Sequence, residues 1–413
     1  MRWLVWPASA HVILAERYDS ILFDLDGVMY RGDRAVDHAG EVIQRLRQQP
    51  RPRLAFVTNN SSRTAAEVAG TLTALGIETR AEEVVTSAEA TAALVDSKGG
   101  GSAFVIGETG IRRALEHRGV RILDGTPASV DWVVVGFDRA ADYGKLRTAS
   151  LLVQRGAKLV ATNADGSYPA PDGAWPGAGA LLAVVTTTTG AVPEVVGKPH
   201  APLFDEARKR AGGGATLFVG DRLETDVAGA SSLGLDTLLV FTGIARPMDV
   251  VRSDVLPVYL GRDLRAILED GPVVRPAADR DADGIEDVLR SSDLEARGVE
   301  ERIHATVVAA TEDGKIVGTA ALEVEGELAH LRSLAVAGRH RRGFLGTLLT
   351  AHEVRNARRS AARELYLATE TAEVFFARLG FERVGVLDAL PGIFRERMKT
   401  SCASTAVTMR LGL

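Results

Sequence analysis

Short apolar runs rich in β-branched residues alternate with stretches of helical spacing over the first two thirds of the chain. Between these runs, His38–Gln49 and Thr64–Gly76 carry apolar residues at helical intervals, and Gly76 is suited to end the second helix. This alternation predicts an α/β architecture built on a parallel sheet. The runs that indicate strands are Ser20–Phe23, Leu54–Val57, Trp132–Val135, Leu159–Ala161, Leu217–Val219 and Thr237–Val240.

The chain is too long for a single hydrophobic core. With 413 residues, it is expected to form two or three domains. Its 46% apolar and 25% charged residues and its net charge of -5 are typical of a soluble globular protein, without the basic excess that favours nucleic-acid binding. We therefore expect a soluble multidomain protein that does not bind nucleic acid.

Two features bear on the cellular location. No segment reaches the roughly 20 apolar residues of a membrane-spanning helix, and Pro7 and His11 interrupt the N-terminal stretch that partly resembles a signal peptide. The single cysteine, Cys402, excludes an intrachain disulfide and is expected to be a structural thiol. These features predict a cytoplasmic protein that neither spans a membrane nor is anchored to one.

Polar residues stand where several of the predicted strands end. Asp24 and Asp26 follow the first strand with one residue between them, and like charges this close repel unless a cation or a reaction uses them. Further polar residues stand in order at later points of the chain. They are Thr58-Asn59-Asn60, Lys198 between Gly197 and Pro199, and Gly220-Asp221 followed by Asp226.

A second Asp-x-Asp-Gly segment, Asp279–Ile285, imitates the start of a calcium-binding loop. The twelfth position of such a loop holds Glu, whereas this chain has Arg290 there. Pro276 precedes the segment and an amphipathic run follows it. We therefore expect these acidic residues to begin a helix, where they interact favourably with the helix dipole.

The residue types at the strand ends suit the hydrolysis of a phosphate monoester. Asp24 can attack phosphorus, which divides one difficult displacement into two easier steps. Mg²⁺ held by Asp24 and Asp221 would cancel the repulsion between the carboxylate and the phosphate. Thr58 and Lys198 would hold phosphate oxygens, and Asp26 would protonate the leaving oxygen and then deprotonate water. Singly, each residue could instead cap a helix, form a turn or lie in solvent; the ordered set favours catalysis.

Four segments, FDLDGV, VTNNS, GKP and GDRLETD, resemble the four motifs of the haloacid dehalogenase-like hydrolases. They are most similar to the subgroup of small-molecule phosphatases that includes N-acetylglucosamine-operon, pyridoxal and glycerol-phosphate phosphatases. The similarity covers about residues 14–268 and implies a Rossmann-like core. It also implies that Asp24 is the nucleophile, which forms an aspartyl phosphate, and that Asp26 is the acid and base and a metal ligand through its backbone carbonyl.

The same resemblance implies roles for the later motifs. Thr58 and Lys198 would bind phosphate, Asp221 would bind Mg²⁺, and Asp226 would orient a metal-bound water. Asn59 and Asn60 add amide and backbone donors next to Thr58, and we expect both to contact the substrate.

The spacing of the motifs predicts an inserted domain. About 140 residues separate Thr58 from Lys198, far more than a core connection needs. We expect a phosphatase core at residues 14–87 and 193–270 and a cap at 88–192, which the resemblance implies is of the C2 type. The Gly/Pro-rich loop Asn163–Gly179 resembles the subgroup's substrate-facing cap loop, with Asn163 and Asp165 as substrate contacts, although it could also be a simple connection.

A cap excludes bulk water and large substrates, so a small phosphorylated metabolite is expected. The two-domain layout resembles that of actinobacterial-type glycerol-phosphate phosphatases, which favours glycerol 3-phosphate. Phosphoglycolate, pyridoxal phosphate and nucleotides remain alternatives, because nothing in the cap loop distinguishes among them.

From Val274 onward the pattern changes to a helix, several strands and a further helix, which indicates an α+β domain at residues 274–413. Glu312-Asp313-Gly314 predicts a hairpin turn. The domain resembles the Gcn5-related N-acetyltransferase (GNAT) fold, whose members bind the pyrophosphate of acetyl-CoA in an Arg-x-x-Gly-x-Gly loop at a helix start. The aligned residues are Arg341, Arg342, Gly343, Phe344, Leu345 and Gly346.

Two interpretations of this domain remain open. It is either an acetyl-CoA-dependent N-acetyltransferase or CoA sensor with the phosphatase half as its partner, or a module that stabilises, dimerises or regulates the phosphatase. We favour the second, because Phe344 stands where the first spaced glycine belongs. Phe376 also stands where many relatives place a proton-donating Tyr, and Thr369 replaces a frequent Asn.

Overall fold

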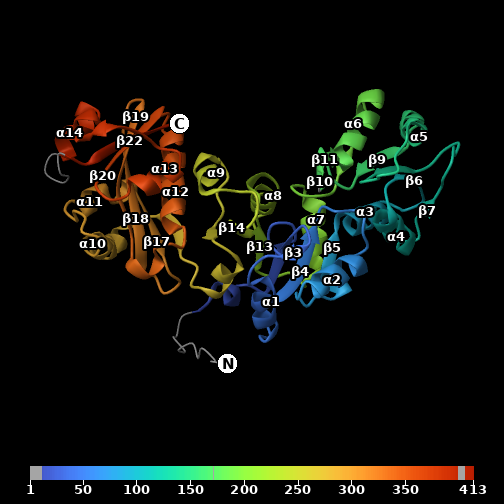
Figure 1. Ribbon diagram of the computed structural model, residues 1–413, viewed down its shortest axis with the longest axis horizontal. Coiled ribbons are helices and arrows are strands. Elements are labelled where there is room, and N and C mark those ends of the chain that lie inside the picture. Colours follow the sequence, from blue (N-terminus) through green and yellow to red (C-terminus); the bar gives the residue numbers. More distant parts are fainter. Residues whose placement is uncertain (1–11, 171, 399–404) are drawn as a thin grey trace. The chain divides into compact units, whose positions relative to one another are not determined.

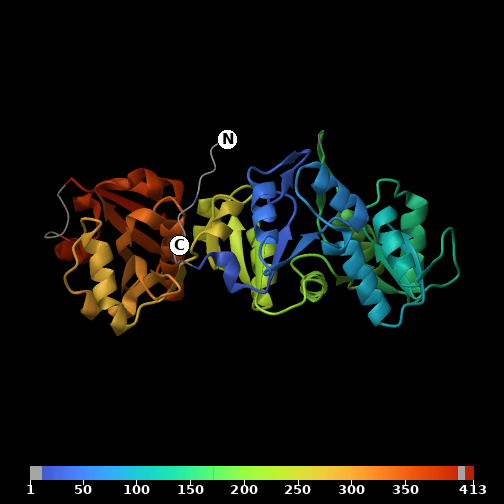
Figure 2. The same cartoon turned by 90° about the horizontal axis from the view of Figure 1, so that it is seen from below.

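The computed structural model describes residues 12–170, 172–398 and 405–413 (Figures 1 and 2). The chain divides into two compact units: an N-terminal unit of residues 18–237, and a C-terminal unit of residues 1–17 and 238–413. Cys402 and most of the N-terminal stretch considered for targeting lie outside the described residues. The bounds predicted for the core, cap and C-terminal domains remain predictions.

The N-terminal unit contains a parallel sheet in which β1, β4 and β13 are predicted apolar runs, whereas β5 was not predicted. Four neighbouring strands are, in order, β13 (Thr216–Gly220), β1 (Ser20–Asp24), β4 (Arg53–Thr58) and β5 (Val84–Thr86), and all pair in parallel. Nearly all of their side chains are buried, as expected for a parallel sheet that helices cover. The helices of this part are α1 (Ala39–Arg47), α2 (Ala65–Ala74), α3 (Ser87–Ser97), α7 (Ala201–Arg210) and α8 (Ala228–Ser232).

Local signals fix the bounds of α2. Thr64 caps its first turn by accepting a hydrogen bond from the backbone amide of Glu67, and the Glu67 carboxylate accepts one from the Thr64 amide in return. At the other end Gly76 has a φ of 81°, which ends the helix as predicted.

A second parallel sheet, with its helices, forms the part of the N-terminal unit that we call the cap. Its strands are, in order, β12 (Glu194–Val195), β9 (Lys158–Ala161), β8 (Trp132–Val135), β6 (Ser102–Ile106) and β7 (Arg121–Ile122). Its helices are α4 (Thr109–His117), α5 (Tyr143–Gln154) and α6 (Ala178–Thr189).

The Gly/Pro-rich segment 163–179, expected to be a loop, contains an antiparallel hairpin. Strands β10 (Ser167–Ala170) and β11 (Gly173–Pro176) pair along their lengths, and Gly173 has a φ of 138°. The hairpin was not predicted because Pro and Gly are rare in strands that pair on both sides. Strands β10 and β11 form a sheet of two strands, so each pairs on one side and tolerates these residues.

The C-terminal unit is built on a mixed seven-stranded sheet, as expected for an α+β domain. The order is β16 (Val273–Pro276), β17 (Thr306–Ala310), β18 (Ile316–Glu325), β19 (Leu328–Val336), β20 (Glu364–Thr369), β22 (Val407–Gly412) and β21 (Glu382–Val386). The predicted hairpin turn at 312–314 joins β17 and β18. Strand β14 (Asp236–Val240), whose residues from Leu238 onward belong to this unit, pairs in parallel with β15 (Tyr259–Gly261). The helices of the unit are α9 (Pro247–Arg252), α10 (Ala282–Arg290), α11 (Val299–Arg302), α12 (Leu345–Arg359), α13 (Glu373–Arg378) and α14 (Gly392–Met398).

Two details of this unit bear on the sequence analysis. The segment around Val274, where the sequence pattern changes, forms strand β16, which pairs with β17 at the edge of the sheet. The acidic residues of the calcium-like segment begin α10, as predicted, and Asp281 pairs with Arg275 at 2.6 Å. Within the described ranges, no helix combines the length and apolar character that a membrane crossing requires.

Candidate active site

Asp24 ends strand β1, and the loops after the neighbouring strands carry other candidate residues. In the parallel register Asp24 lies beside Val57, one residue before Thr58. Asp221 directly follows Gly220, the last residue of β13. Because parallel strands end at the same edge of a sheet, these residues meet where open α/β sheets bind ligands.

Lys198 lies among carboxylates at this edge. Its Nζ is 2.5 Å from Oδ1 of Asp24 and 2.7 Å from Oδ1 of Asp226, and all three side chains are buried. Carboxylate oxygens of Asp24, Asp221 and Asp226 lie within 4.8 Å of one another. One lysine therefore shares the cluster with three acidic groups, and the negative charge in excess suits a bound cation.

Burial and charge shift the pKa values of this cluster. The pKa of Asp24 lies well above its usual value because burial disfavours the ionised form; Lys198 lowers it, and Asp226 and Asp221 raise it. Burial lowers the pKa of Lys198, but Asp226 and Asp24 together raise it more, so that it lies above its usual value. Lys198 is therefore a fixed positive charge, and further positive charge would favour the ionised form of Asp24.

Asp226 is held by the backbone that follows β13. Its Oδ2 accepts hydrogen bonds from the backbone amides of Asp221 and Arg222, at 3.0 and 3.1 Å. Gly220 permits this approach, because a Cβ there would lie 2.3 Å from the Cβ of Asp226. Asp226 belongs to a π-helical turn, Leu223–Val227, a local distortion that is frequent at functional sites.

Asp26 lies in the turn after β1, and its side chain is exposed. Gly27, with a φ of 82°, allows the chain to reverse there. The protein atoms around Asp26 displace solvent and thereby raise the pKa of its carboxyl group, whereas Lys198 and Arg222 lower it. An exposed carboxyl group with a raised pKa that interacts with Lys198 suits a group that donates and accepts a proton.

The loop after β4 is fixed by its own side chains. The buried Oγ1 of Thr58 accepts a hydrogen bond from the backbone amide of Asn60 at 3.1 Å. Oδ1 of Asn60 in turn accepts hydrogen bonds from the backbone amide and the hydroxyl of Ser62, both at 2.8 Å. The loop therefore holds the hydroxyl of Thr58 at the end of β4, next to the strand that carries Asp24.

Three other residues predicted to bind substrate form one connected group. Nδ2 of Asn59 donates to Oδ2 of Asp165 at 3.1 Å, and Nδ2 of Asn163 donates to the backbone oxygen of Asn59 at 2.7 Å. The backbone amide of Asp165 donates to Oδ1 of Asn163 at 3.0 Å. Asn59 belongs to the core and the other two to the cap, so the predicted residues meet across the boundary between core and cap.

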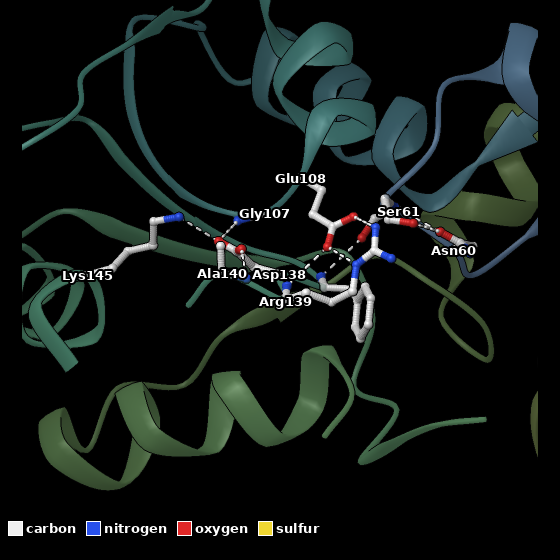
Figure 3. Close-up of polar contacts among 10 residues, drawn as sticks. Asn60, Ser61, Gly107, Glu108, Asp138, Arg139, Ala140 and Lys145 are labelled. Carbon is white, nitrogen blue, oxygen red and sulfur yellow. Dashed lines mark hydrogen bonds and ion pairs between the residues drawn. The ribbon is translucent and has the colours of Figure 1, made fainter. Parts of the chain in front are cut away.

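Charged and aromatic residues of the cap lie beside the loop after β4. Figure 3 shows Asn60 and Ser61 near Glu108 and Arg139, whose side chains form two hydrogen bonds of 2.7 and 2.8 Å. The rings of Phe137 and Tyr168 stack with centroids 4.4 Å apart. The cap therefore presents both an ion pair and an aromatic pair in this region.

Sequence reasoning missed Tyr30 and Arg222, which interact with the charges of the site. Burial raises the pKa of Tyr30, and so do Asp26 and Asp24, while Arg222 lowers the pKa of Asp26. Arg222 directly follows Asp221 in the GDRLETD segment, so an examination of that motif for cations could have found it. For Tyr30 there was no comparable signal, because its approach depends on the turn after β1.

The loop predicted to bind acetyl-CoA lies in the C-terminal unit. Phe344 precedes α12 with a φ of 61°, a left-handed conformation that favours glycine. Its ring centroid lies 4.5 Å from that of Phe241, and the guanidinium carbon of Arg262 lies 5.8 Å from it. Nε of Arg341 donates to the backbone oxygen of Val336 at 2.9 Å. The loop thus keeps the backbone turn of a glycine but carries a packed aromatic ring there.

Three protein-family models match parts of the chain. The family described as haloacid dehalogenase-like hydrolase matches residues 21–121, and one described as HAD-hydrolase-like matches residues 195–267. The acetyltransferase (GNAT) domain family matches residues 276–402.

Several curated and solved relatives are named as phosphatases. The acid sugar phosphatase of Staphylococcus saprophyticus is 37% identical over 258 residues, which cover 62% of this chain and 98% of that protein. The D-glycerol 3-phosphate phosphatase of Mycobacterium tuberculosis is 37% identical over 268 residues, 64% of this chain and 75% of that protein. A crystal structure of the M. tuberculosis glycerol phosphate phosphatase with magnesium aligns with a TM-score of 0.70 and 29% identity, covering 89% of this chain and 99% of that one.

Proposed function

The chain belongs to the haloacid dehalogenase-like hydrolases and is a phosphoric monoester hydrolase, and we propose that it is a Mg²⁺-dependent phosphatase whose substrate is glycerol 3-phosphate. The observation that carries the proposal is the buried cluster of Asp24, Asp221 and Asp226, two of which, Asp24 and Asp226, pair with the ammonium group of Lys198. The cluster joins a nucleophile, a fixed cation and oxygen ligands at one edge of a parallel sheet.

The donor set of this cluster fits Mg²⁺. Its ligands are hard carboxylate oxygens, and Mg²⁺ is bound in proteins by one or two carboxylates together with water and phosphate oxygens. Asp24 and Asp221 would hold the ion, and the backbone carbonyl oxygen of Asp26 would be a further ligand. Asp226, which accepts a hydrogen bond from the backbone amide of Asp221, would lie beside these ligands. When bound, Mg²⁺ would offset the repulsion between the carboxylates and an anionic phosphate.

In the first step, a carboxylate oxygen of Asp24 attacks the phosphorus atom. The new bond joins this oxygen to phosphorus, and the bond between phosphorus and the oxygen of the alcohol breaks. Asp26 donates a proton to that leaving oxygen, so the alcohol departs neutral. Lys198 and Thr58 hold oxygens of the transferred phosphoryl group and stabilise the charge that it carries.

In the second step, water attacks the phosphorus of the aspartyl phosphate. Asp26, now ionised, accepts the proton of that water, and the bond from phosphorus to the oxygen of Asp24 breaks. Inorganic phosphate leaves and both carboxyl groups return to their initial states. The exposed position of Asp26 suits this role, because the residue must reach both the leaving oxygen and the entering water.

The choice of glycerol 3-phosphate is supported by the shared layout of the whole chain. The M. tuberculosis structure covers both the phosphatase part and the GNAT-like part of this chain. Sugar phosphates join phosphoglycolate, pyridoxal phosphate and nucleotides as alternatives, in view of the staphylococcal relative that is named an acid sugar phosphatase. A cytoplasmic location fits such a metabolite and is supported by the single cysteine of the sequence.

Phosphate release from a panel of these monoesters tests the proposal. Wild-type protein is assayed with Mg²⁺, and again after chelation and dialysis. We expect metal-dependent turnover with the highest kcat/KM for glycerol 3-phosphate. Turnover that survives chelation would contradict the metal dependence, and a higher kcat/KM for another member of the panel would reassign the substrate.

We propose that the GNAT-like domain stabilises or regulates the phosphatase, with dimerisation as one such role. Support comes from Phe344, whose ring packs against Phe241 at the point where acetyl-CoA binding requires an open backbone. The alternative, an acetyl-CoA-dependent transferase or sensor, is supported by the match to the GNAT family and by the exposed Arg341, Arg342 and Gly343.

Thermal unfolding with acetyl-CoA separates these alternatives. A ligand that binds only the native state raises its melting temperature at concentrations well above the Kd. We expect no shift at millimolar acetyl-CoA. A rise that coenzyme A also produces, but adenosine alone does not, would favour the alternative.

A further inference from the structure

The cap is joined to the core through the short loop that follows Thr58. The backbone amide of Gly110 in the cap donates to the backbone oxygen of Ser62 at 2.9 Å, and that of Phe137 donates to Oγ of Ser61 at 3.3 Å. Figure 3 shows Ser61 beside the cap residues at this contact. The loop that positions the hydroxyl of Thr58 therefore also accepts hydrogen bonds from the cap.

Lys198 is attached to the same junction. The residue before it, Gly197, continues the edge of the cap sheet, because its backbone amide donates to the backbone oxygen of Thr162 at 2.8 Å. The backbone amide of Lys198 donates instead to Oδ1 of Asn59 at 2.7 Å. The backbone that carries the ammonium group is thus held by the cap on one side and by the core on the other.

Asn59 holds Lys198 with both ends of its side-chain amide. While Oδ1 accepts from the backbone amide of Lys198, Nδ2 donates to the backbone oxygen of Lys198 at 3.2 Å and to Oδ2 of Asp165 at 3.1 Å. The orientation of the amide is fixed by its partners, since Oδ1 faces a donor and Nδ2 faces two acceptors. One side chain therefore binds the catalytic lysine and the cap together.

Gly197 shows how closely the two parts approach. A Cβ at this position would lie 2.6 Å from the backbone oxygen of Thr162, 2.7 Å from Oδ1 of Asn59 and 2.8 Å from Cβ of Asn163. Two of these neighbours belong to the cap and one to the core. The junction accepts no side chain at this point, so a displacement of the cap must displace Lys198 or break these contacts.

We propose that Asn59 is a positioning residue that couples the seating of the cap to the placement of the Lys198 ammonium group. The inference rests on the proposed function, in which that ammonium group holds the transferred phosphoryl group. Asn59 adjoins Thr58, so one loop sets the two phosphate-binding groups relative to each other. Cap movement reaches Lys198 through Asp165 and Thr162, and a seated cap therefore completes the phosphate site.

A double-mutant cycle between Asn59 and Lys198 tests this coupling. We choose p-nitrophenyl phosphate with Mg²⁺ as the probe, because a good leaving group keeps slow variants measurable. Misplacement of a reacting group by about 1 Å can cost about 100-fold in rate, so we expect Asn59→Ala to lower kcat by about 10- to 100-fold. In a Lys198→Met background, the same substitution should change kcat by less than about twofold, because no ammonium group remains to be misplaced.

A purely structural role for Asn59 predicts a different result. Its loss would then reduce kcat by the same factor in both backgrounds, and such independent effects, or an unchanged kcat in Asn59→Ala, would overturn the inference. Inactive wild-type protein, or full activity in Lys198→Met, would instead refute the proposed function itself. Asn356→Ala is a matched control, since it also removes an amide bonded to a carboxylate, Oε2 of Glu353 at 2.8 Å, and it should leave kcat unchanged.

A reciprocal exchange tests the link to the cap without loss of side-chain volume. Asn59→Asp places a second carboxylate against Asp165, and we expect a loss of activity at least as large as in Asn59→Ala. Adding Asp165→Asn restores a donor and an acceptor between the two side chains, whereas the backbone oxygen of Lys198 stays without its amide donor. We therefore expect a partial recovery of about tenfold in kcat relative to Asn59→Asp. If the exchange restores the melting temperature but not the activity, Asp165 does not help to place Lys198, and the inferred link to the cap is wrong.

Discussion

Both units bury carboxylates, but the surroundings of these groups differ. In the N-terminal unit, Asp24 and Asp226 share the ammonium group of Lys198 at the end of a parallel sheet. In the C-terminal unit, Glu353 on α12 accepts a hydrogen bond from Nδ2 of Asn356, and burial raises its pKa to about 8. The first arrangement pairs buried charges at the edge of a parallel sheet, whereas the second keeps a carboxyl group neutral where a helix packs.

The two units also differ in how completely their residues match the motifs of the family that each resembles. Every residue of the phosphatase motifs that carries chemistry is present, and the structure gathers Asp24, Lys198, Asp221 and Asp226. In the GNAT-like loop, Phe344 replaces a glycine and packs against Phe241. In the first unit the motif side chains lie together as the proposed chemistry requires, whereas in the second a packed ring stands where the family motif has a glycine.

The largest effect expected of a single substitution is that of Asp24→Asn. An amide cannot form the aspartyl phosphate, and the loss of a nucleophile typically costs about 10⁴- to 10⁶-fold in kcat. Thermal stability should be kept or improved, because the substitution removes one of three carboxylates within 4.8 Å. Phosphate release and melting temperature are measured on the same preparation, and substantial turnover by the variant would refute the covalent mechanism.

The substitution Asp26→Asn sharpens the division of labour among the carboxylates. A general acid contributes about 10²- to 10⁴-fold, and most where the leaving oxygen is basic. We therefore expect the first step to slow strongly for glycerol 3-phosphate and little for p-nitrophenyl phosphate, whose leaving group needs no proton. Single-turnover rates on both substrates measure this difference, and equal losses would reassign the acid.

Much of this site was predictable because its residues follow strands. The apolar runs locate the strand ends, and the parallel sheet brings Asp24, Thr58 and Asp221 to one edge. The position of Asn59 was predicted but its bonding was not, since its partner Lys198 lies 139 residues away and is reached only through the cap. Such contacts depend on the packing of two sheets, which no local pattern records.

Other features depended on tertiary context in the same way. The start of the C-terminal domain was predicted at Val274 from the change of pattern, but strand β16 was not, because it forms only where β17 offers an edge to pair with. The left-handed conformation of Phe344 could not be predicted either, because a Phe rarely adopts it without contacts that stabilise it. In each case a distant partner outweighs the local preference.

The pH dependence of stability should distinguish the buried Glu353 from the phosphatase carboxylates. Its pKa of about 8 in the folded chain exceeds the usual value of 4.5, so between these pH values the unfolded chain releases a proton that the folded chain retains. Glu353 therefore lowers the free energy of unfolding as pH rises through this window. The side chain of Glu353→Gln mimics the neutral carboxyl group and does not titrate, so the free energy of unfolding of this variant lacks that decrease.

We accordingly expect Glu353→Gln to gain stability over the wild type from pH 5 to pH 8.5, by up to about 4 kcal/mol. Calorimetric unfolding of both proteins at several pH values measures this gain, and phosphatase activity serves as the control that should not change. A difference in stability that stays constant with pH would mean that Glu353 is ionised in the folded protein.

The smallest effect concerns Phe344, and it tests whether the packed ring or the backbone turn governs the GNAT-like loop. Left-handed backbone costs an ordinary residue about 1–2 kcal/mol relative to glycine, so Phe344→Gly loses the contact with Phe241 but relieves this cost. Phe344→Ala loses the contact and keeps the cost. We expect the Gly variant to be about 1 kcal/mol more stable than the Ala variant, with the phosphatase kcat unchanged in both. Equal stability would show that the loop relaxes to another conformation once the ring is removed, and a rise in melting temperature with acetyl-CoA in Phe344→Gly alone would identify the ring as what closes this loop to the cofactor.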